Sequence, residues 1–364
     1  MLNCTLLNQI FDNDVILDDK QSYVLFGADI KGGLLYELLS DNGLDIKFFV
    51  DNNVNKQNTC FHGKIIYPVV KLLEQPASKI ILTLSPLYIE DVNKQLSDLG
   101  IDSERVIIPK NCDFAPFGVR EEVLNQLNVN KDRIALTMSL LEDERSKKVL
   151  KGILKYCETI DLSEISAIYD NRYPQYFDEE LILFNNDEVF VDGGCLDFGT
   201  SFQFLRKVDN FKKIYAFEPD RFNFSRIKEA TKHLDINKVV IFNKGIYSEK
   251  KTVYFDCLGF FGSKVVDSGT EQVDVDCLDN LVEEASFIKF DIEGSEYEGL
   301  LGSRMIIKKY KPKLAIAVYH KVSDLWKIPL LIKEFYDGYR LYFRHYCNFM
   351  RTETICYAIP DLKN

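Results

Sequence analysis

The sequence predicts an α/β protein with two doubly wound, mainly parallel sheets joined by a helical segment. Short apolar strands alternate with helical stretches over residues 22–110, and the alternation resumes from residue 188 onward. This pattern is typical of parallel sheets covered by helices. The intervening residues have mainly helical periodicity. We therefore expect a small Rossmann-like domain over 1–110, a helical connector over 111–180 and a larger α/β domain over 181–364.

The composition favours packed cores and a small-molecule ligand. Of the 364 residues, 46% are hydrophobic and only 10 are proline, so long disordered segments are not expected. The 56 acidic and 45 basic residues give a net charge of -11. This charge disfavours nonspecific attraction to nucleic acid or to an anionic membrane surface.

The sequence contains no recognisable targeting segment or membrane span. The amino terminus, "MLNCTLLNQIFDNDVILDDK", lacks a basic region followed by a long apolar core, and no apolar run approaches the roughly 20 residues that cross a bilayer. The nine cysteines are scattered without a CxxC pair, which indicates reduced thiols rather than a zinc site or disulfides. These features predict a cytoplasmic protein.

The first turn of the amino-terminal domain is a partial nucleotide-binding fingerprint. "GADIKG", from Gly27 to Gly32, has the outer glycines of GxGxxG, but Asp29 stands where a pyrophosphate needs bare backbone. Asp51, 24 residues after Gly27, ends the second strand and could accept hydrogen bonds from a ribose. Two interpretations stay open: a domain that binds a nucleotide or nucleotide sugar, and a docking or structural domain.

The carboxyl-terminal domain should end in an antiparallel hairpin. Its last two strands, "YRLYFRHY" and "TICYAIP", have no long helix between them, whereas the earlier strands alternate with helices. This order fits a class I methyltransferase sheet. An earlier hairpin is expected in "KTVYFDCLGFFGSKVVD". Just before the domain, the aromatic segment from Tyr173 to Phe177 either packs helix on sheet or covers a ligand.

Acidic residues follow the strands at the edge where open parallel sheets bind ligands. "EVFVDGG" leads into Asp192, Gly193 and Gly194, and Glu218 ends the next strand, 26 residues beyond Asp192. Glu218 is placed to hold both hydroxyls of a ribose, whereas Asp192 and Asp197 would repel a pyrophosphate. S-adenosylmethionine removes this conflict, because it has no phosphate and carries sulfonium and ammonium cations. The structural alternative is a helix cap, a turn and a surface acid at these positions.

Two later strand ends provide candidates for acceptor chemistry. "FIKFDIEGSEYEGLLGS" places Asp291 after a strand, with Glu293 and Glu296 behind it, and "LAIAVYH" ends at His320. Asp291 could act as a base, orient a hydroxyl or hold a divalent metal. His320, with an ordinary pKa near ~6.5, suits the removal of a hydroxyl proton. Helix capping, salt bridging and a purely structural histidine are the competing interpretations.

Weaker candidates for the acceptor pocket come from two other stretches. The hairpin contributes Gly262 and Ser263, and the strand "YFRHY" contributes Arg344 and His345, which could bind an anionic acceptor. Such residues are also common at strand edges.

The region from about 181 to 360 resembles the FkbM family of S-adenosylmethionine-dependent methyltransferases. The matching pieces are "VFVDGGCLDFGTS", "YAFEPDRFNF", "VDVDCLDNL", "FIKFDIEGSEYEGLLGS", "KPKLAIAVYH" and "YRLYFRHY". The resemblance implies that Asp192, Gly194 and Glu218 belong to the cofactor site and that "DIEG" lies beside the methyl-transfer centre. It also implies an O-methyltransferase for a sugar or small metabolite, often in bacterial surface polysaccharide synthesis, with an amino-terminal domain that engages a nucleotide-linked sugar.

One position departs from the family pattern. Phe198 stands where the family usually has glycine, and Gly199 follows it. The ring either narrows the cofactor loop or only shifts the turn. Three functions therefore stay open: methyl transfer to a hydroxyl of a glycan precursor, nucleotide-sugar modification or oxidoreduction by the amino-terminal domain, and a noncatalytic role with a degenerate methyltransferase fold.

Overall fold

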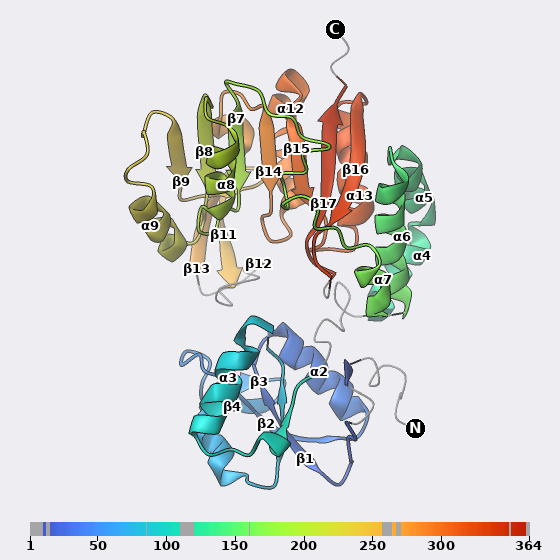
Figure 1. Ribbon diagram of the computed structural model, residues 1–364, viewed down its shortest axis with the longest axis vertical. Helices are drawn as coiled ribbons and strands as arrows, with labels where there is room; N and C mark the ends of the chain where they lie inside the picture. The colour runs from blue at the N-terminus through green and yellow to red at the C-terminus, as the bar shows by residue number, and fades with distance from the viewer. Residues whose placement is uncertain are drawn as a thin grey trace. The chain divides into compact units, whose positions relative to one another are not determined.

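The computed structural model describes residues 10–11, 15–84, 86–109, 120–159, 161–256, 264–266, 271–348 and 351–361. The chain divides into two compact units, Met1–Pro116 and Phe117–Asn364, and each is built on its own parallel-rich sheet (Figure 1). The prediction of two α/β sheets is confirmed. The described part of the chain contains no helix that is long and apolar enough to cross a membrane.

The first unit contains a six-stranded sheet in the order β3-β4-β2-β1-β5-β6. Neighbouring strands are parallel except β3 and β4. Residues that alternate along β1 face opposite sides of the sheet: Leu25 packs in one core with Leu35 of α2, and Val24 in another with Val92 of α3. The strands are β1 (Ser22–Phe26), β2 (Asp45–Val50), β3 (Cys60–Phe61), β4 (Lys64–Tyr67), β5 (Lys79–Leu82) and β6 (Val106–Ile107), and the helices are α2 (Ile30–Asp41) and α3 (Pro86–Asp98).

The second unit is built on a seven-stranded sheet in the order β16-β17-β15-β14-β7-β8-β9. β17 is antiparallel to both of its neighbours, whereas the pairs from β15 to β9 are parallel. The class I methyltransferase sheet with a closing hairpin is therefore confirmed. Its strands are β7 (Val189–Gly193), β8 (Lys213–Phe217), β9 (Val239–Phe242), β14 (Phe287–Phe290), β15 (Lys313–Ala317), β16 (Tyr339–His345) and β17 (Thr354–Pro360).

Helices cover this sheet because its central strands are mainly apolar on both faces. All residues of β7 and β14 are buried, and the ring of Phe190 stacks between those of Phe204 and Phe287 at centroid distances of 4.7 and 4.9 Å. The connecting helices are α8 (Gly199–Lys207), α9 (Arg221–Ala230), α10 (Leu278–Leu281), α11 (Glu296–Leu301), α12 (Arg304–Tyr310) and α13 (Asp324–Phe335).

A small second sheet lies between β9 and α10 in the sequence, in the order β10-β13-β11-β12. Its strands are β10 (Gly245–Ile246), β11 (Lys251–Asp256), β12 (Lys264–Val266) and β13 (Glu271–Asp276). β11 and β12 are antiparallel, which confirms the expected hairpin. Gly262 and Ser263 lie outside the described residues.

The helices that the sequence placed between the two sheets lie in the second unit. They are α4 (Arg120–Val129), α5 (Lys131–Leu140), α6 (Glu144–Thr159) and α7 (Leu162–Ser166), and they stand beside β16 (Figure 1). The backbone N–H of Phe343 in β16 donates to Oγ of Ser146 in α6 at 2.9 Å. This contact ties the helical segment to the edge of the sheet.

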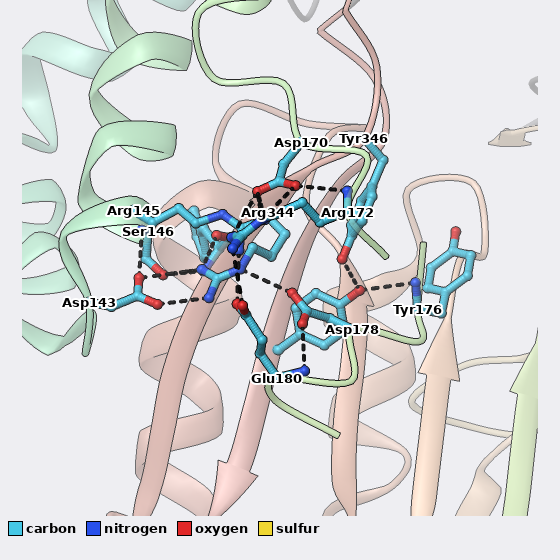
Figure 2. Close-up of polar contacts among 12 residues, drawn as sticks. Asp143, Arg145, Ser146, Asp170, Arg172, Tyr176, Asp178, Glu180, Arg344 and Tyr346 are labelled. Atoms are coloured by element: carbon cyan, nitrogen blue, oxygen red, sulfur yellow. Dashed lines mark hydrogen bonds and ion pairs between the residues drawn. The ribbon is translucent and has the colours of Figure 1, made fainter. Parts of the chain in front are cut away.

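Arg344 of β16 forms ion pairs with the same segment of the chain. Its guanidinium donates to Asp143 at 2.7 Å and to Asp178 at 3.1 Å (Figure 2), and the side chain is only 2% exposed. His345 is fully buried, with Nδ1 2.7 Å from Oγ1 of Thr354. The suggestion that Arg344 and His345 bind an anionic acceptor is therefore wrong, because both side chains are enclosed by the protein.

Candidate active site

The strands β7, β8, β14 and β15 end at one edge of the seven-stranded sheet, where parallel sheets bind ligands. The loops that follow them contain the residues predicted from the sequence. Because β17 is antiparallel, its amino end lies at the same edge, and the N–H of Val318 donates to the carbonyl of Thr354 at 3.0 Å. This arrangement brings Glu353, just before β17, to the edge as well.

The glycine turn after β7 touches the turn after β14. Gly194 has a φ of +75°, and a Cβ there would lie 1.8 Å from the carbonyl oxygen of Asp291. A Cβ on Gly193 would lie 2.6 Å from Cδ1 of Phe290. Only glycine permits the approach of the two backbones at position 194, and a side chain at position 193 would press against the ring of Phe290.

A buried lysine in β14 secures the glycine turn. Lys289 is the register partner of Asp192, and its Nζ lies 3.1 Å from Oδ1 of Asp192. The same ammonium donates to the carbonyls of Gly193 and Gly194 at 3.1 and 2.7 Å. Burial lowers the pKa of Lys289, but the charge of Asp192 opposes it, and the pKa stays above its ordinary value. The lysine is therefore cationic at neutral pH.

Asp192 is fully buried behind this turn. Its Oδ2 accepts a hydrogen bond from the hydroxyl of Ser201 at 2.7 Å, and Lys289 balances its charge. The carboxylate therefore positions the turn from within the protein. A sequence signal for this pair was available: a lysine inside the apolar strand "FIKF" requires a partner, because a buried charge without one is very unfavourable.

Glu218 follows β8 and connects two loops. Its carboxyl oxygens accept the backbone N–H groups of Leu196 and Asp220, each at 2.9 Å. The residue is only 5% exposed, and burial raises its pKa to about 7 despite these hydrogen bonds. The structure thus brings Glu218 next to the glycine turn, with a carboxyl group that titrates close to neutral pH.

Phe198 occupies the position where the resemblance leads one to expect glycine. It is the N-cap of α8 and has a φ of +70°, a left-handed conformation that is uncommon for phenylalanine. Its ring is fully buried and packs edge-on against Phe202, with centroids 5.1 Å apart. The ring therefore fills the core beneath the turn. Asp197 beside it accepts the N–H of Gly199 at 2.8 Å.

Asp291 is held in one orientation by two tyrosines. The hydroxyl of Tyr176 donates to Oδ2 at 2.7 Å, and that of Tyr319 donates to Oδ1 at 2.9 Å. Burial alone would raise the pKa of Asp291. The positive charges of His320 and Lys289, together with the two tyrosine hydrogen bonds, outweigh burial and hold the pKa below its ordinary value. Asp291 is therefore an oriented carboxylate and a weak base.

His320 lies among three carboxylates. Its Nδ1 is 3.0 Å from Oε1 of Glu296, and its Nε2 is 3.4 Å from Glu293 and 3.6 Å from Asp291. Burial lowers the pKa of His320, but the charges of Glu296 and Asp291 and hydrogen bonds to Glu293 and Glu296 outweigh burial and hold the pKa well above its ordinary value. The structure brings Asp291 and His320 together, but the ordinary pKa assumed for the histidine does not apply.

Asp291, Glu296 and His320 can each offer a ligand atom within 4.8 Å of the others. Oxygen and imidazole donors at this spacing suit a divalent ion. Oε1 of Glu296 already accepts the N–H of Ile292 at 2.8 Å, and a metal ion would have to displace the proton of His320. Metal binding here would therefore weaken as the pH falls.

Glu353 is a further candidate, and no motif in the sequence points to it. Nε2 of Gln175 donates to its Oε2 at 2.6 Å. Burial, with a further contribution from the charge of Asp291, raises the pKa of Glu353 to about 7. A carboxyl group with such a pKa can exchange protons at neutral pH. The signal was positional: the residue before an antiparallel strand lies at the edge where the parallel strands end.

Unfavourable backbone conformations gather at this edge. Tyr176, Leu196, Phe198, Glu293 and Glu353 have φ values of 67°, 50°, 70°, 55° and 71°. Residues that are not glycine adopt this region at a free-energy cost that surrounding structure must offset, and such residues cluster at functional sites. Their distribution therefore points to the same loops as the carboxyl groups do.

The glycine turn of the first unit is organised differently. Oδ1 of Asp29 accepts the N–H of Gly32 at 2.9 Å and caps α2. Oδ2 of Asp51 accepts the N–H of Ala28 at 2.9 Å and lies 3.3 Å from Nζ of Lys56. Asp29 thus places a carboxylate at the helix end where a phosphate would otherwise bind.

A known family model matches the part of the chain that forms most of the seven-stranded sheet. Residues 186–350 match the family model described as the methyltransferase FkbM domain. The second unit therefore contains an FkbM methyltransferase domain. The FkbM match includes Asp192, Glu218, Asp291 and His320, whereas Glu353 and β17 follow it in the sequence. No protein of curated function matches the chain.

A solved structure extends the likeness in fold beyond the FkbM domain. An FkbM methyltransferase from Methylobacillus flagellatus is 19% identical, with coverage of 93% of this chain and 90% of that chain and a TM-score of 0.63. A putative methyltransferase from Streptococcus mutans in complex with SAH is 15% identical over 50% of this chain and 93% of its own, with a TM-score of 0.34. This second likeness is too slight to bear on function.

Proposed function

We propose that the FkbM domain transfers a methyl group from S-adenosylmethionine to a hydroxyl group of a sugar or glycan precursor, as in bacterial surface polysaccharide synthesis. The observation that carries this proposal is the concentration of carboxyl groups with raised pKa values at the edge of the sheet where the glycine turn lies. Glu218 and Glu353 both have pKa values raised to about 7 by burial. A cationic ligand at this edge would relieve that accumulation of acidic groups.

The residues of the edge fit S-adenosylmethionine. Glu218 would accept hydrogen bonds from the ribose hydroxyls, and the glycine turn of Gly193 and Gly194 lies beside it. Asp192 and Lys289 hold the turn from below. When bound, the cofactor supplies a methyl group that its sulfonium already activates for transfer. The protein's remaining task is to orient the acceptor hydroxyl and to take its proton.

We assign these tasks to residues around Asp291. The carboxylate of Asp291, fixed by its two tyrosines, would orient the acceptor hydroxyl. His320, as an imidazolium, keeps Asp291 ionised, so its contribution would be electrostatic rather than that of a base. Glu353 is the better proton acceptor, because its pKa of about 7 matches neutral conditions.

Replacing Glu353 by glutamine should lower turnover at pH 7 by about 10²- to 10⁴-fold, the usual contribution of a general base. The affinity for S-adenosylmethionine should change little. Transfer of labelled methyl to a panel of sugars and glycan precursors measures both effects. Glu229→Gln, which changes an exposed acid on α9, is the control. Full turnover by Glu353→Gln would remove this residue from the mechanism.

Binding of S-adenosylmethionine near pH 7 should release protons. Glu218 and Glu353 are partly protonated in the free protein, and a cationic ligand favours their ionised forms. The affinity should therefore rise between pH 6 and pH 8. Calorimetric titrations in buffers of different ionisation enthalpy measure this release. S-adenosylhomocysteine, which lacks the sulfonium charge, should release fewer protons. Proton uptake on binding would contradict the assignment.

The raised pKa values of Glu218 and Glu353 also predict how the stability of the free protein depends on pH. Between about pH 4.5 and pH 7 the folded protein holds protons on Glu218 and Glu353 that the unfolded chain has lost. The contribution of these groups to the free energy of unfolding should therefore decrease as the pH rises through this window. Bound S-adenosylmethionine should offset the decrease.

A further inference from the structure

An open cavity of about 370 Å³, lined by residues 170–175 and Tyr346, lies close to Asp291, Glu296, His320 and Glu353, which are called the Asp291 cluster below. It is at the same edge of the seven-stranded sheet as the catalytic candidates. The N–H of Asp170 donates to the carbonyl of His345, the last residue of β16, at 2.9 Å. The N–H of Tyr346 donates to the carbonyl of Glu353 at 3.0 Å. Pockets of this volume hold small-molecule ligands.

Hydrogen bonds connect the cavity wall directly to Asp291. Nε2 of Gln175, which lines the cavity, lies 3.1 Å from the hydroxyl of Tyr176 and 2.6 Å from Oε2 of Glu353. The Tyr176 hydroxyl in turn donates to Asp291 at 2.7 Å. The hydroxyl of Tyr176 therefore links the cavity wall to Asp291, the carboxylate proposed to orient the acceptor.

A second chain of hydrogen bonds fixes the other wall. The hydroxyl of Tyr346 lies 2.6 Å from that of Tyr357, which accepts the backbone N–H of Tyr176 at 3.0 Å. Figure 2 shows this connection running from Tyr346 to the backbone of Tyr176. The left-handed backbone of Tyr176 is held by these contacts. The cavity and the Asp291 cluster thus share one rigid framework.

The charges at the cavity do not favour an anion. Arg172 lines it, but its guanidinium pairs with Asp170 at 3.2 Å and with Glu180 at 3.0 Å. Arg145 also pairs with Asp170 (Figure 2). The charges of these two arginines are balanced by the carboxylates of Asp170 and Glu180. Within the part of the chain that the structure describes, no unbalanced cation lines this cavity, so a phosphate would find little attraction there.

The remaining lining groups suit an uncharged sugar ring. Tyr173, Pro174 and Tyr346 provide apolar and aromatic surface, on which the C–H face of a pyranose can pack. Asn171 provides an amide that can donate to and accept from hydroxyls, and the amide oxygen of Gln175 can accept from them. We propose that residues 170–175 and Tyr346 form a subsite for a neutral glycosyl ring of the acceptor, next to the hydroxyl that is methylated.

This inference rests on the proposed methyl transfer. It adds the place where a sugar ring of the acceptor binds. The subsite takes an uncharged sugar unit, and a diphosphate on a nucleotide-linked acceptor would have to lie outside it.

Binding of methyl glycosides to the full chain tests the subsite. Saturation-transfer NMR with methyl α-D-glucopyranoside, methyl α-D-mannopyranoside and methyl α-D-galactopyranoside should detect binding of at least one of them in the presence of S-adenosylhomocysteine. Tyr173→Ala and Asn171→Ala should each raise the Kd about tenfold, which corresponds to ~1.4 kcal/mol. Tyr169→Ala should leave the Kd unchanged, because Tyr169 is 37% exposed in the same segment but does not line the cavity.

Other outcomes would overturn the subsite. Absence of glycoside binding, equal binding by the Tyr173→Ala and Asn171→Ala variants, or preference for glucose 6-phosphate over the neutral glycosides would each do so. Calorimetry with S-adenosylmethionine on the same samples separates the two proposals. Cofactor binding without glycoside binding would reject only the subsite, whereas absence of cofactor binding would reject the methyl-transfer function on which it rests.

Discussion

Alanine at position 194 should abolish binding of S-adenosylmethionine. The new Cβ would lie 1.8 Å from the carbonyl oxygen of Asp291, and backbone cannot yield as a flexible side chain can. The turn after β7 and the turn after β14 would have to separate. Gly194→Ala should also lower the free energy of unfolding by more than the roughly 1–2 kcal/mol that a left-handed conformation alone costs a non-glycine residue.

A matched glycine separates the steric contact from the backbone strain. Gly43 has a φ of +80°, and a Cβ there would meet nothing within 4 Å. Gly43→Ala should therefore cost only about 1–2 kcal/mol and leave cofactor affinity intact. Denaturant unfolding and calorimetry measure both quantities. Cofactor binding by Gly194→Ala at the affinity of the unchanged protein would contradict the contact between the two turns.

Lys289→Met should destabilise the FkbM domain by about 3–5 kcal/mol, the usual effect of removing one member of a buried ion pair. The substitution would leave Asp192 fully buried without its counter-charge and would leave the carbonyls of Gly193 and Gly194 without their donor. Cofactor affinity should fall as well, because the glycine turn loses its support.

Replacing Asp192 together with Lys289 tests whether the two residues are coupled. In Lys289→Met/Asp192→Asn, the buried negative charge is gone and the asparagine can still accept from Ser201. The double variant should therefore recover a substantial part of the lost stability in denaturant unfolding. Lys251→Met, which breaks an exposed pair with Glu249, should leave the unfolding midpoint nearly unchanged. Additive losses in the double variant would show that Lys289 and Asp192 are not coupled.

The fold was accessible from the sequence because its signals are local. Apolar strands alternate with helices, and the absence of a helix between the last two strands is enough to predict that β17 is antiparallel. The glycines and Asp291 were also accessible, because they follow predicted strands whose carboxyl ends must lie at one edge. These inferences depend on periodicity and topology rather than on detailed packing.

Other features depend on contacts between residues distant in the sequence. The raised pKa of His320 comes from carboxylates on another loop, so its ordinary value could not be assumed. The direction of the Phe198 ring depends on how the core is packed beneath the turn. Glu353 reaches the site only because β17 runs antiparallel beside β15. A lysine inside an apolar strand indicates a buried partner, so a structural role for Lys289 could be suspected from the sequence. Which residue is that partner depends on the register between β7 and β14, which pairs Lys289 with Asp192.

Calorimetric titration of the full chain with S-adenosylmethionine tests the central claim most directly. The predicted result is saturable binding to one site, weakened at least tenfold by Glu218→Gln, which removes the carboxylate proposed to hold the ribose hydroxyls. Glu229→Gln on the exposed face of α9 should bind as the unchanged protein does. Absence of binding to the folded, unchanged protein would contradict the assignment of this edge as a methyltransferase site.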